Sequence, residues 1–387
     1  MPKFKQSNRS TAAKAARLLP AAQGYRMPAE WEPHESTWLA WPHYRGDWPG
    51  KFDPIPWVYA EIIRNLARHE RVNLVINDAA SEKKVRAVLE KADALSDNVS
   101  FHHWRTDRVW TRDSGCIFLT PALTPTKNNA DPLLALHFQF NAWAKYSNFA
   151  ADEKLGEHMA VAAGADLVRP LIKGDQKNRM GKGRVVLEGG SIDVNGQGTL
   201  LTSEECLLSA TQQRNPLMDR FAYEQMFADY FGVQSVIWLD SGIAGDDTHG
   251  HVDDITRFVA PTAVVTMIEL DELSENYVPL QANLGRLKNA RTADGQKLDI
   301  VELPMPRPVI FAGRQLPASY ANFYIANGAV LVPVFNDPND RIALNALAEL
   351  FPTREIIPIY SGDLIWGFGA LHCMTQQQPA LEGRAVL

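Results

Sequence analysis

Residues 251–303, HVDDITRFVAPTAVVTMIELDELSENYVPLQANLGRLKNARTADGQKLDIVEL, contain one complete copy of the unit that predicts the fold. Two strands are expected in 251–268, separated by Ala260-Pro261, because proline interrupts a run of apolar and β-branched residues. A helix is expected near 277–288 and a further strand over 299–303. The order of this unit is therefore strand, strand, helix, strand.

The same order recurs about five times along the chain, with a period of roughly 70 residues, which is typical of repeated supersecondary units that pack against one another. We expect strands over 36–42, 71–77, 99–104, 110–119, 133–140, 167–172, 235–239 and 355–359. Helices are expected over 59–68, 82–92, 154–163, 219–231 and 341–351. Hairpins are expected over 185–201 and 319–334, where Asn195-Gly196 and Asn327-Gly328 supply the turns.

Polar residues stand at the strand tips of four units. They are Arg112-Asp113, Glu188-Gly189-Gly190, His251-Val252-Asp253 and Tyr320-Ala321-Asn322. In a ring of such units these tips would converge on one central site.

Composition limits the class of protein. The chain has 387 residues, of which 45% are hydrophobic and 22% charged, so it is long enough for a substantial globular core. A net charge of −6 argues against nucleic acid as a partner. Three cysteines cannot form a disulfide framework, and no signal-peptide or membrane-length apolar run is present. The expectation is a cytoplasmic protein without a membrane partner.

The first 24 residues differ from the rest. Residues 1–23 carry five basic side chains and no acidic one, which is typical of a disordered basic tail, with an organelle-targeting segment as the alternative. We therefore expect residues 25–387 to form one catalytic domain.

A cysteine close to the C-terminus is the candidate nucleophile. The stretch Trp366-Gly367-Phe368-Gly369-Ala370-Leu371-His372-Cys373 places a thiol behind a glycine-rich bend and beside a histidine. Such a thiol can be an activated nucleophile. Taken alone, a single cysteine is more often a small buried hydrophobic residue, so the case for Cys373 depends on the groups that accompany it. Cys116 and Cys206 are expected to be structural.

Acidic and histidine side chains suggest what accompanies the thiol. Asp113 follows an arginine, as in many surface ion pairs, whereas Glu188 ends an apolar strand, where an acid needs a partner or a function. If 249–253 is a strand, His249, His251 and Asp253 share one face. That set suits either zinc or iron, or a general acid–base histidine beside a substrate-binding aspartate, and a solvated loop is the third interpretation.

A series of motifs makes the comparison specific. MPAEWEPHESTWLAWP, WTRDSG, FNAW, VVLEGGSIDVNGQGTLLTSEECLL, GDDTHGHVDD, LPASYANFYIANGAVLVPVF and HCMTQQQP occur in the order found in the agmatine deiminase family. The sequence resembles this family from about position 25 to Pro379. The family is related to the bacterial peptidyl-arginine deiminases within the guanidine-modifying superfamily.

This resemblance implies an α/β fold, a five-bladed propeller of ββαβ modules around a central active site. It implies hydrolysis of a guanidinium to a ureido group and ammonia through a covalent thiol intermediate, without a metal or other cofactor. Matched motif by motif, the nucleophile is Cys373, the acid–base residue His251 and its supporting carboxylate Glu188. The guanidinium-binding carboxylates are Asp113 and Asp253.

The substrate is expected to be a small cationic guanidine, agmatine first, forming N-carbamoylputrescine. Asp246, Asp247, Trp110 and Trp366 offer carboxylates and aromatic faces to an ammonium tail, and Arg112 is the obvious opposing charge. Asp247 and Trp110 are therefore candidate substrate-binding residues. His249, Asp254, Ala144 and Ala370 depart from the residues usual in agmatine deiminases, which leaves peptidyl-arginine or another guanidine as an alternative.

Two other classes remain open at this stage. One is a metallohydrolase that uses His249, His251 and Asp253, and the other is a non-catalytic binder of cationic guanidines. The sequence does not decide whether identical chains associate into a homo-oligomer.

Overall fold

The computed structural model describes residues 19–122, 132–172 and 183–381. Within them, the strands form five sheets of three or four strands and one two-stranded hairpin. The predicted basic tail, residues 1–24, falls mostly outside the described residues, and its last part forms the short helix η1 (Pro20–Gln23). Among the described helices, none is both long and apolar enough to cross a membrane.

The five sheets repeat one pattern, in which an antiparallel pair of strands is followed by a parallel neighbour. In chain order their strands are β2 (His34–Ala40), β3 (Arg71–Ile76) and β4 (Val99–His103); β1 (Tyr25–Arg26), β5 (Ile117–Pro121), β6 (Leu134–Leu136) and β7 (Asp166–Val168); β8 (Asp193–Val194), β9 (Thr199–Ser203) and β10 (Ser235–Leu239); β11 (Thr256–Ala260), β12 (Ala263–Ile268) and β13 (Asp299–Pro304); and β16 (Tyr324–Ile325), β17 (Ala329–Val334) and β18 (Glu355–Tyr360).

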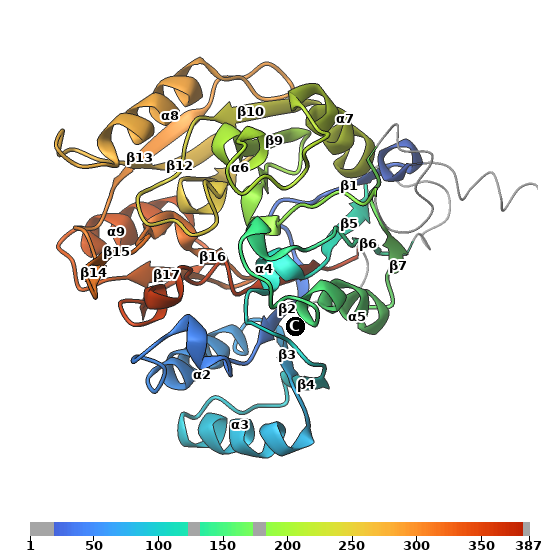
Figure 1. Cartoon of the computed structure of the whole chain (residues 1–387), viewed down its shortest axis with the longest axis vertical. Coiled ribbons are helices and arrows are strands. Elements are labelled where there is room, and N and C mark those ends of the chain that lie inside the picture. The colour runs from blue at the N-terminus through green and yellow to red at the C-terminus, as the bar shows by residue number, and fades with distance from the viewer. Residues whose placement is uncertain (1–18, 123–131, 173–182, 382–387) are drawn as a thin grey trace, which may run out of the picture.

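A helix connects a pair of parallel strands in each sheet, which completes a ββαβ unit; in the first sheet a second helix also connects β3 to a third parallel strand, β4. These helices are α2 (Ile55–Leu66), α5 (Leu155–Ala162), α7 (Arg220–Phe231), α8 (Tyr277–Asn289) and α9 (Asp340–Leu350). They lie toward the outside of the molecule, together with α3 (Ala79–Lys91), while α4 (Thr111–Ser114) lies near its middle (Figure 1). The predicted repeat is confirmed, with most element bounds within a few residues of those expected. The remaining helix of more than one turn is α6 (Glu204–Leu208).

The first unit takes its outer strand from the other end of the chain. β19 (Gln376–Pro379) pairs antiparallel with β2, so the sheet order is β19-β2-β3-β4. Gln378 lies beside Ser36 in this pairing although 342 positions separate them. The segment that follows Cys373 is thereby built into the first sheet of the protein.

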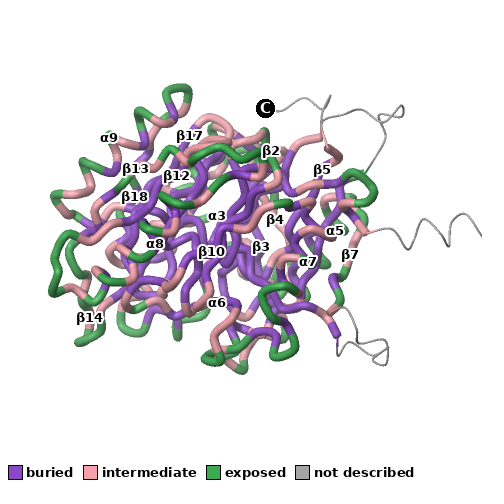
Figure 2. Tube along the Cα trace, turned by 90° about the horizontal axis from the view of Figure 1, so that it is seen from above, coloured by how far each residue is buried: buried purple, intermediate pink, exposed green. Residues whose placement is uncertain are grey.

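The helices form where apolar spacing and capping coincide. In α2, Ile55, Tyr59, Ile62, Ile63 and Leu66 are buried at positions that share one helical face. Helix α7 begins after Asp219, whose side chain accepts a hydrogen bond from the backbone N–H of Ala222, and ends at a glycine with φ of 72°. The buried interior runs between the sheets and their outer helices, and exposed residues concentrate on helix surfaces and loops (Figure 2).

One part of the fold was not predicted. The hairpin β14 (Ile310–Phe311) and β15 (Arg314–Gln315) stands apart from the five sheets. Its strands are two residues long, too short for any periodicity to reveal.

Candidate active site

The polar strand tips named from the sequence lie in short helical turns rather than in strands. These turns are α4, η5 (Gly189–Ser191), η6 (Val252–Asp254) and η7 (Tyr320–Asn322). Successive turns contact one another, α4 with η5, η5 with η6 and η6 with η7. The Cys373 loop completes the circuit, because His372 N–H donates to the Asn322 carbonyl and Arg112 N–H donates to the Cys373 carbonyl. The expected convergence of the tips is confirmed.

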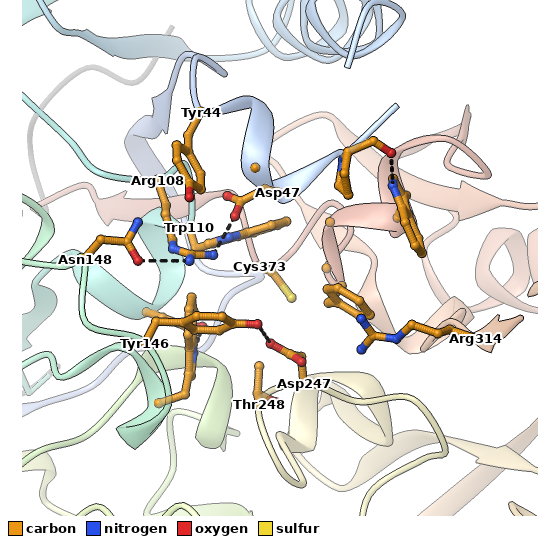
Figure 3. Close-up of a pocket in the computed structure, with 18 residues that line it drawn as sticks. Tyr44, Asp47, Arg108, Trp110, Tyr146, Asn148, Asp247, Thr248, Arg314 and Cys373 are labelled. Carbon is orange, nitrogen blue, oxygen red and sulfur yellow. Dashed lines mark hydrogen bonds and ion pairs between the residues drawn. The ribbon is translucent and has the colours of Figure 1, made fainter. Parts of the chain in front are cut away.

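A cavity of about 280 Å³ opens above this circuit (Figure 3). Asp113 and Cys373 line it and are each only 4% exposed, which places them at its floor. Tyr44 and Arg314, which are much more exposed, lie toward its mouth. The cavity therefore leads from solvent to a buried carboxylate and a buried thiol.

The Cys373 sulfur lies among polar groups. Its Sγ is 3.0 Å from Asn322 Nδ2 and 3.6 Å from Asp253 Oδ2. Burial raises the pKa of the Cys373 thiol well above its usual value, and the carboxylates of Asp253 and Asp113 raise it further. Without a cation beside it, this thiol stays protonated near neutral pH.

Asp113 and Asp253 are both buried, and their surroundings differ. Asp113 Oδ1 accepts from the Gly190 N–H at 3.0 Å, and Oδ2 accepts from Trp143 Nε1 at 2.9 Å. Burial nevertheless raises the pKa of Asp113 to about 6, against the opposing charge of His251. Asp253 has one bound oxygen, Oδ2, while its buried Oδ1 has no hydrogen-bond partner among the described residues. Both carboxylates can therefore accept further hydrogen bonds from a cation.

His251 stands between these carboxylates and Glu188. Its Nδ1 is 3.8 Å from Asp113 Oδ1 and 4.0 Å from Asp253 Oδ1, and its Nε2 is 3.7 Å from Glu188 Oε2. Both ring nitrogens are buried without a hydrogen-bond partner among the described residues. Although burial opposes protonation, the Asp113 and Glu188 carboxylates and the Cys206 side chain hold the pKa of His251 well above its usual value. A positively charged imidazole thus lies beside Asp113, which lines the cavity floor.

Glu188 is held in its ionised form. Arg214 Nε donates to Glu188 Oε1 at 3.1 Å, and neither side chain is exposed. Burial alone would raise the pKa of Glu188, but the Arg214 guanidinium and the His251 imidazole lower it to about 2. Glu188 therefore stays negatively charged beside His251.

Gly190 makes the close approach of these groups possible. A Cβ at this position would lie 2.6 Å from His251 Nδ1 and 3.0 Å from both Asp113 Oδ1 and Asp253 Oδ2. Because real Cβ atoms do not tolerate such contacts, only glycine fits here. The second glycine of Glu188-Gly189-Gly190 is the residue that brings the imidazole and both carboxylates together.

His372 is a second charged group beside Asp253, and the sequence assigned it no role. His372 Nδ1 is 2.7 Å from Asp253 Oδ2, and its Nε2 is 2.7 Å from Glu30 Oε2. Because carboxylates only accept, both ring nitrogens donate, and the ring is an imidazolium. Glu30 also pairs with Arg257 and Arg112. Its position in the MPAEWEP motif was the available signal, but no local pattern shows that a glutamate will meet residues more than 300 positions away.

The wall of the cavity contains Trp110 and Asp247, as expected of substrate-binding residues. The Asp247 carboxylate, however, is already bound to Lys145 Nζ at 2.6 Å and to the Tyr146 hydroxyl at 2.5 Å. Figure 3 shows the Tyr146–Asp247 contact at the side of the cavity opposite Asp47. Asp247 is therefore a partly neutralised carboxylate rather than a free one.

Two charged groups named from the sequence do not face the cavity. Arg112 points away from the cavity and donates to Gln377 and Glu30. Asp246 accepts from the backbone N–H groups of Thr248 and Gly250 and is absent from the described lining. The cations that do line the cavity are Arg108 and Arg314. Each lies two residues before a matched motif, Arg108 before WTRDSG and Arg314 before LPASYANF.

Arg108 and Arg314 differ in how they are paired. Arg108 Nη1 donates to Asp47 Oδ1 at 2.5 Å, whereas Arg314 stacks on the Phe368 ring at 4.5 Å. No acidic side chain among the described residues forms an ion pair with Arg314. The mouth of the cavity thus has one cation whose charge is not neutralised.

The proposed metal set of His249, His251 and Asp253 does not form. The backbone turns at His249 (φ 67°) and Gly250 (φ 90°) and then enters η6, so the residues do not alternate along a strand. His249 faces Ser209 and Glu205 instead of His251. Among the described residues, ligand atoms gather within 4.8 Å in two other sets, Glu188–Cys206–His251 and Asp253–Asp254–Cys373. The prediction of a shared face was wrong.

Comparison with known proteins agrees with this geometry. Residues 26–379 match the model of the Porphyromonas-type peptidyl-arginine deiminase family. The agmatine deiminase of Pseudomonas aeruginosa (strain LESB58) is 34% identical over 379 residues, covering 93% of this chain and 97% of the relative. The Legionella pneumophila (strain Paris) protein named as an agmatine deiminase is 33% identical over 363 residues, covering 93% and 97%.

Solved structures give the same result. The agmatine deiminase of Enterococcus faecalis is 29% identical, with a TM-score of 0.82 over 94% of this chain and 98% of that one. A C. jejuni agmatine deiminase variant with substrate bound is 29% identical, with a TM-score of 0.77 over 92% and 96%. The chain therefore belongs to the Porphyromonas-type peptidyl-arginine deiminase family and is an agmatine deiminase-like hydrolase of C–N bonds.

Proposed function

We propose that this protein hydrolyses a small guanidine, agmatine first, to the ureido product and ammonia through a thiouronium formed on Cys373. One observation carries this proposal. Two carboxylates, a thiol and an imidazole whose nitrogens have no hydrogen-bond partner among the described residues lie close together, at and just beneath the cavity floor, and this is the set that guanidinium hydrolysis requires. The names of the similar relatives support agmatine as the first substrate to test.

Asp113 and Asp253 are proposed to bind the guanidinium. Its N–H groups are planar and fixed in direction, so two carboxylates can hold the cation and orient its plane by charge-assisted hydrogen bonds. At ~4 Å and an effective dielectric of about 20, each contact has a Coulomb energy of roughly 4 kcal/mol before desolvation is subtracted. The unpartnered Asp253 Oδ1 is the acceptor that such a cation would satisfy.

Substrate charge would also activate the nucleophile. The pKa of the Cys373 thiol is raised by burial and by surrounding carboxylates, so a bound guanidinium that neutralises those carboxylates lowers the pKa again. The thiolate would then form only where a substrate is present to react with it.

The covalent steps balance with these residues, one water and proton exchange with solvent. When the guanidinium binds, the Cys373 thiol gives its proton to solvent; the thiolate adds to the guanidinium carbon, and His251 donates a proton to the departing nitrogen, which leaves as ammonia. Water then adds to the thiouronium carbon while His251 takes one of its protons. The C–S bond breaks to release the thiolate, and the added hydroxyl loses its remaining proton to solvent, which leaves the neutral ureido product. Glu188, fixed by Arg214, keeps the imidazole charged and oriented.

Several broader properties are proposed with this function. The five ββαβ units would form a five-bladed propeller around the site, with residues 25–387 as one catalytic domain. We also propose a cytoplasmic location, with no nucleic-acid or membrane partner, and association into a homo-oligomer as a state to be measured by sedimentation.

The decisive experiment replaces the thiol. Cys373→Ser should abolish ammonia release from agmatine while leaving its binding measurable by calorimetry, because an alcohol is a much weaker nucleophile than a thiolate. Cys116→Ser, which changes a buried thiol outside the site, is the matched control and should keep activity. Turnover by Cys373→Ser within tenfold of the unmodified enzyme would place the nucleophile elsewhere.

A second substrate class is favoured by Arg314. An unneutralised cation at the mouth suits a guanidine that ends in a carboxylate, such as arginine or a peptidyl-arginine. Ureido formation from agmatine, arginine and a blocked peptidyl-arginine at equal concentration separates the two classes. Faster turnover of arginine or of the peptide would overturn agmatine as the preferred substrate and leave the chemistry intact.

A further inference from the structure

Asn322 lies in direct contact with the candidate nucleophile. It belongs to η7 and is 1% exposed. Its Oδ1 accepts from the backbone N–H of His372 at 3.0 Å and from that of Cys373 at 3.4 Å. Because an N–H can only donate, these two bonds fix which end of the amide faces the loop.

The fixed orientation directs the amide nitrogen at the sulfur. Asn322 Nδ2 is 3.0 Å from Cys373 Sγ and 2.9 Å from Asp254 Oδ1. The two amide hydrogens are thus divided between the sulfur and this carboxyl group. Such a donor stabilises a thiolate more than a thiol, because a hydrogen bond to a charged acceptor is the stronger one.

Asp254 is suited to hold the Asn322 amide as an uncharged hydrogen-bond acceptor. It is 2% exposed, and its Oδ2 has no hydrogen-bond partner among the described residues. Burial raises the pKa of Asp254 well above its usual value, and the neighbouring carboxylates of Asp253 and Asp246 raise it further. A neutral carboxyl can accept from Asn322 without placing another negative charge beside the thiolate.

We propose that Asn322 is a further catalytic residue, whose amide N–H stabilises the Cys373 thiolate, and that Asp254 is a positioning residue that holds this amide. The inference rests on the proposed function for its nucleophile. It assigns to the LPASYANF motif a chemical task that the motif match did not supply. The other ionisable groups that act on the thiol or on which it acts are Asp113, Asp253 and Tyr59. His251 and His372 both lie beside Asp253, whose carboxylate contacts the sulfur.

The test measures the thiolate itself. A haloacetamidine carries an amidinium that imitates the guanidinium, and it alkylates a thiolate rather than a thiol. Asn322→Ala should move the pH midpoint of Cys373 alkylation up by about one to two units, the equivalent of losing one hydrogen bond to a charged group. At pH 7.5 the alkylation rate should fall about ten- to a hundred-fold, as expected from the same loss.

A second variant, Asn322→Asp, controls for a folding defect in Asn322→Ala. This change is nearly isosteric and keeps an oxygen for the two backbone N–H groups, but it replaces the donor to sulfur with an acceptor. It should raise the alkylation midpoint at least as far as Asn322→Ala. Asn283→Ala is the matched control, since Asn283 is equally buried and binds only the backbone of Asp240 and Ser241. It should lower Tm without moving the midpoint.

Asp254 is tested by separating charge from hydrogen bonding. Asp254→Asn keeps a neutral acceptor oxygen and should leave the alkylation midpoint within about half a unit, whereas Asp254→Leu should raise it. A folded Asn322 variant with an unchanged midpoint would overturn the inference, even if agmatine turnover by the unmodified enzyme confirmed the proposed function. If the unmodified enzyme released no ammonia but the midpoint still moved, the proposed function would fail and Asn322 would keep its role toward the thiolate.

Discussion

At the scale of single residues, the two carboxylates proposed to bind the guanidinium differ in what controls their charge. Asp113 has its pKa raised to about 6, with burial as the main cause. Although burial would also raise the pKa of Asp253, the hydrogen bond and charge of His372 lower it below the usual value. Only Asp113 therefore changes charge in the mildly acidic range.

The first prediction concerns this pH range. Protonation of Asp113 removes a charge needed to hold the guanidinium, so kcat/KM for agmatine should fall with decreasing pH below about 6. The limiting slope should be about tenfold per pH unit, since one proton is bound. A kcat/KM profile from pH 4.5 to 8 measures this slope. The Asp113→Asn variant should have low activity and should not show the fall in kcat/KM below about pH 6. Persistence of this fall in that variant would assign it to another group.

The second prediction concerns the tail of the substrate. Arg314 repels the ammonium of agmatine and attracts the carboxylate of arginine. Arg314→Gln should raise kcat/KM for agmatine relative to that for arginine by about two- to fivefold, a modest factor because the side chain is exposed and screened. Arg307→Gln removes an exposed arginine that is paired with Asp337 and does not line the cavity, so the ratio should stay constant. An unchanged ratio in Arg314→Gln would place the substrate tail elsewhere.

At the scale of elements, the sequence predicted long periodic segments well and short turns poorly. The expected helix over 277–288 is observed as Tyr277–Asn289, because apolar spacing continues over several turns. His249, His251 and Asp253 would share one face only if 249–253 were a strand, but positive φ angles at His249 and Gly250 reverse the chain there. The motif match still identified His251 and Asp253, since it depends on residue identity rather than on backbone direction.

The third prediction compares glycines in two elements. A methyl group at position 190, in η5, would meet His251, Asp113 and Asp253, so Gly190→Ala should reduce kcat/KM at least a hundredfold, as displacement of catalytic groups by about 1 Å does. A Cβ at Gly285 in α8 meets nothing within 4 Å. Gly285→Ala should therefore keep activity and stabilise the fold by about 0.5–1 kcal/mol. Steady-state kinetics and chemical unfolding of both variants test these expectations. Full activity of Gly190→Ala would contradict the site geometry.

At the scale of the whole molecule, contacts between distant segments define the active site. His372 meets Glu30 from the beginning of the chain, and β19 pairs with β2. The repeat and the family motifs predicted that units would come together and which residues would meet at the centre. They did not predict Asn322 as a donor to the sulfur or Arg314 at the mouth. Those contacts depend on loop conformations that hydrophobic periodicity does not encode.

The fourth prediction concerns the junction between the chain ends. Gln377 Oε1 accepts from the buried Arg112 guanidinium at 2.6 Å, whereas Gln376 Oε1 is buried without a partner. Gln377→Leu should lower the free energy of unfolding by about 1–3 kcal/mol, because it leaves a charged donor unsatisfied. Gln376→Leu, a buried change of the same size in the same strand, should cost much less. Equal losses in denaturant titrations would show that β19 contributes only through its backbone pairing.

The pairing of β2 with β19 also has a consequence for biosynthesis. In β2 and β19, 342 positions separate Ser36 from Gln378, so the nascent chain carries an unpaired sheet edge while all of the intervening sequence is synthesised. The thiol and its neighbours can assemble only after the final strand has left the exit tunnel. We expect ribosome-bound chains stalled just before position 376 to be cleaved readily by protease near β2, and released full-length chains to resist. Equal resistance of the two would show that the first sheet closes without its last strand.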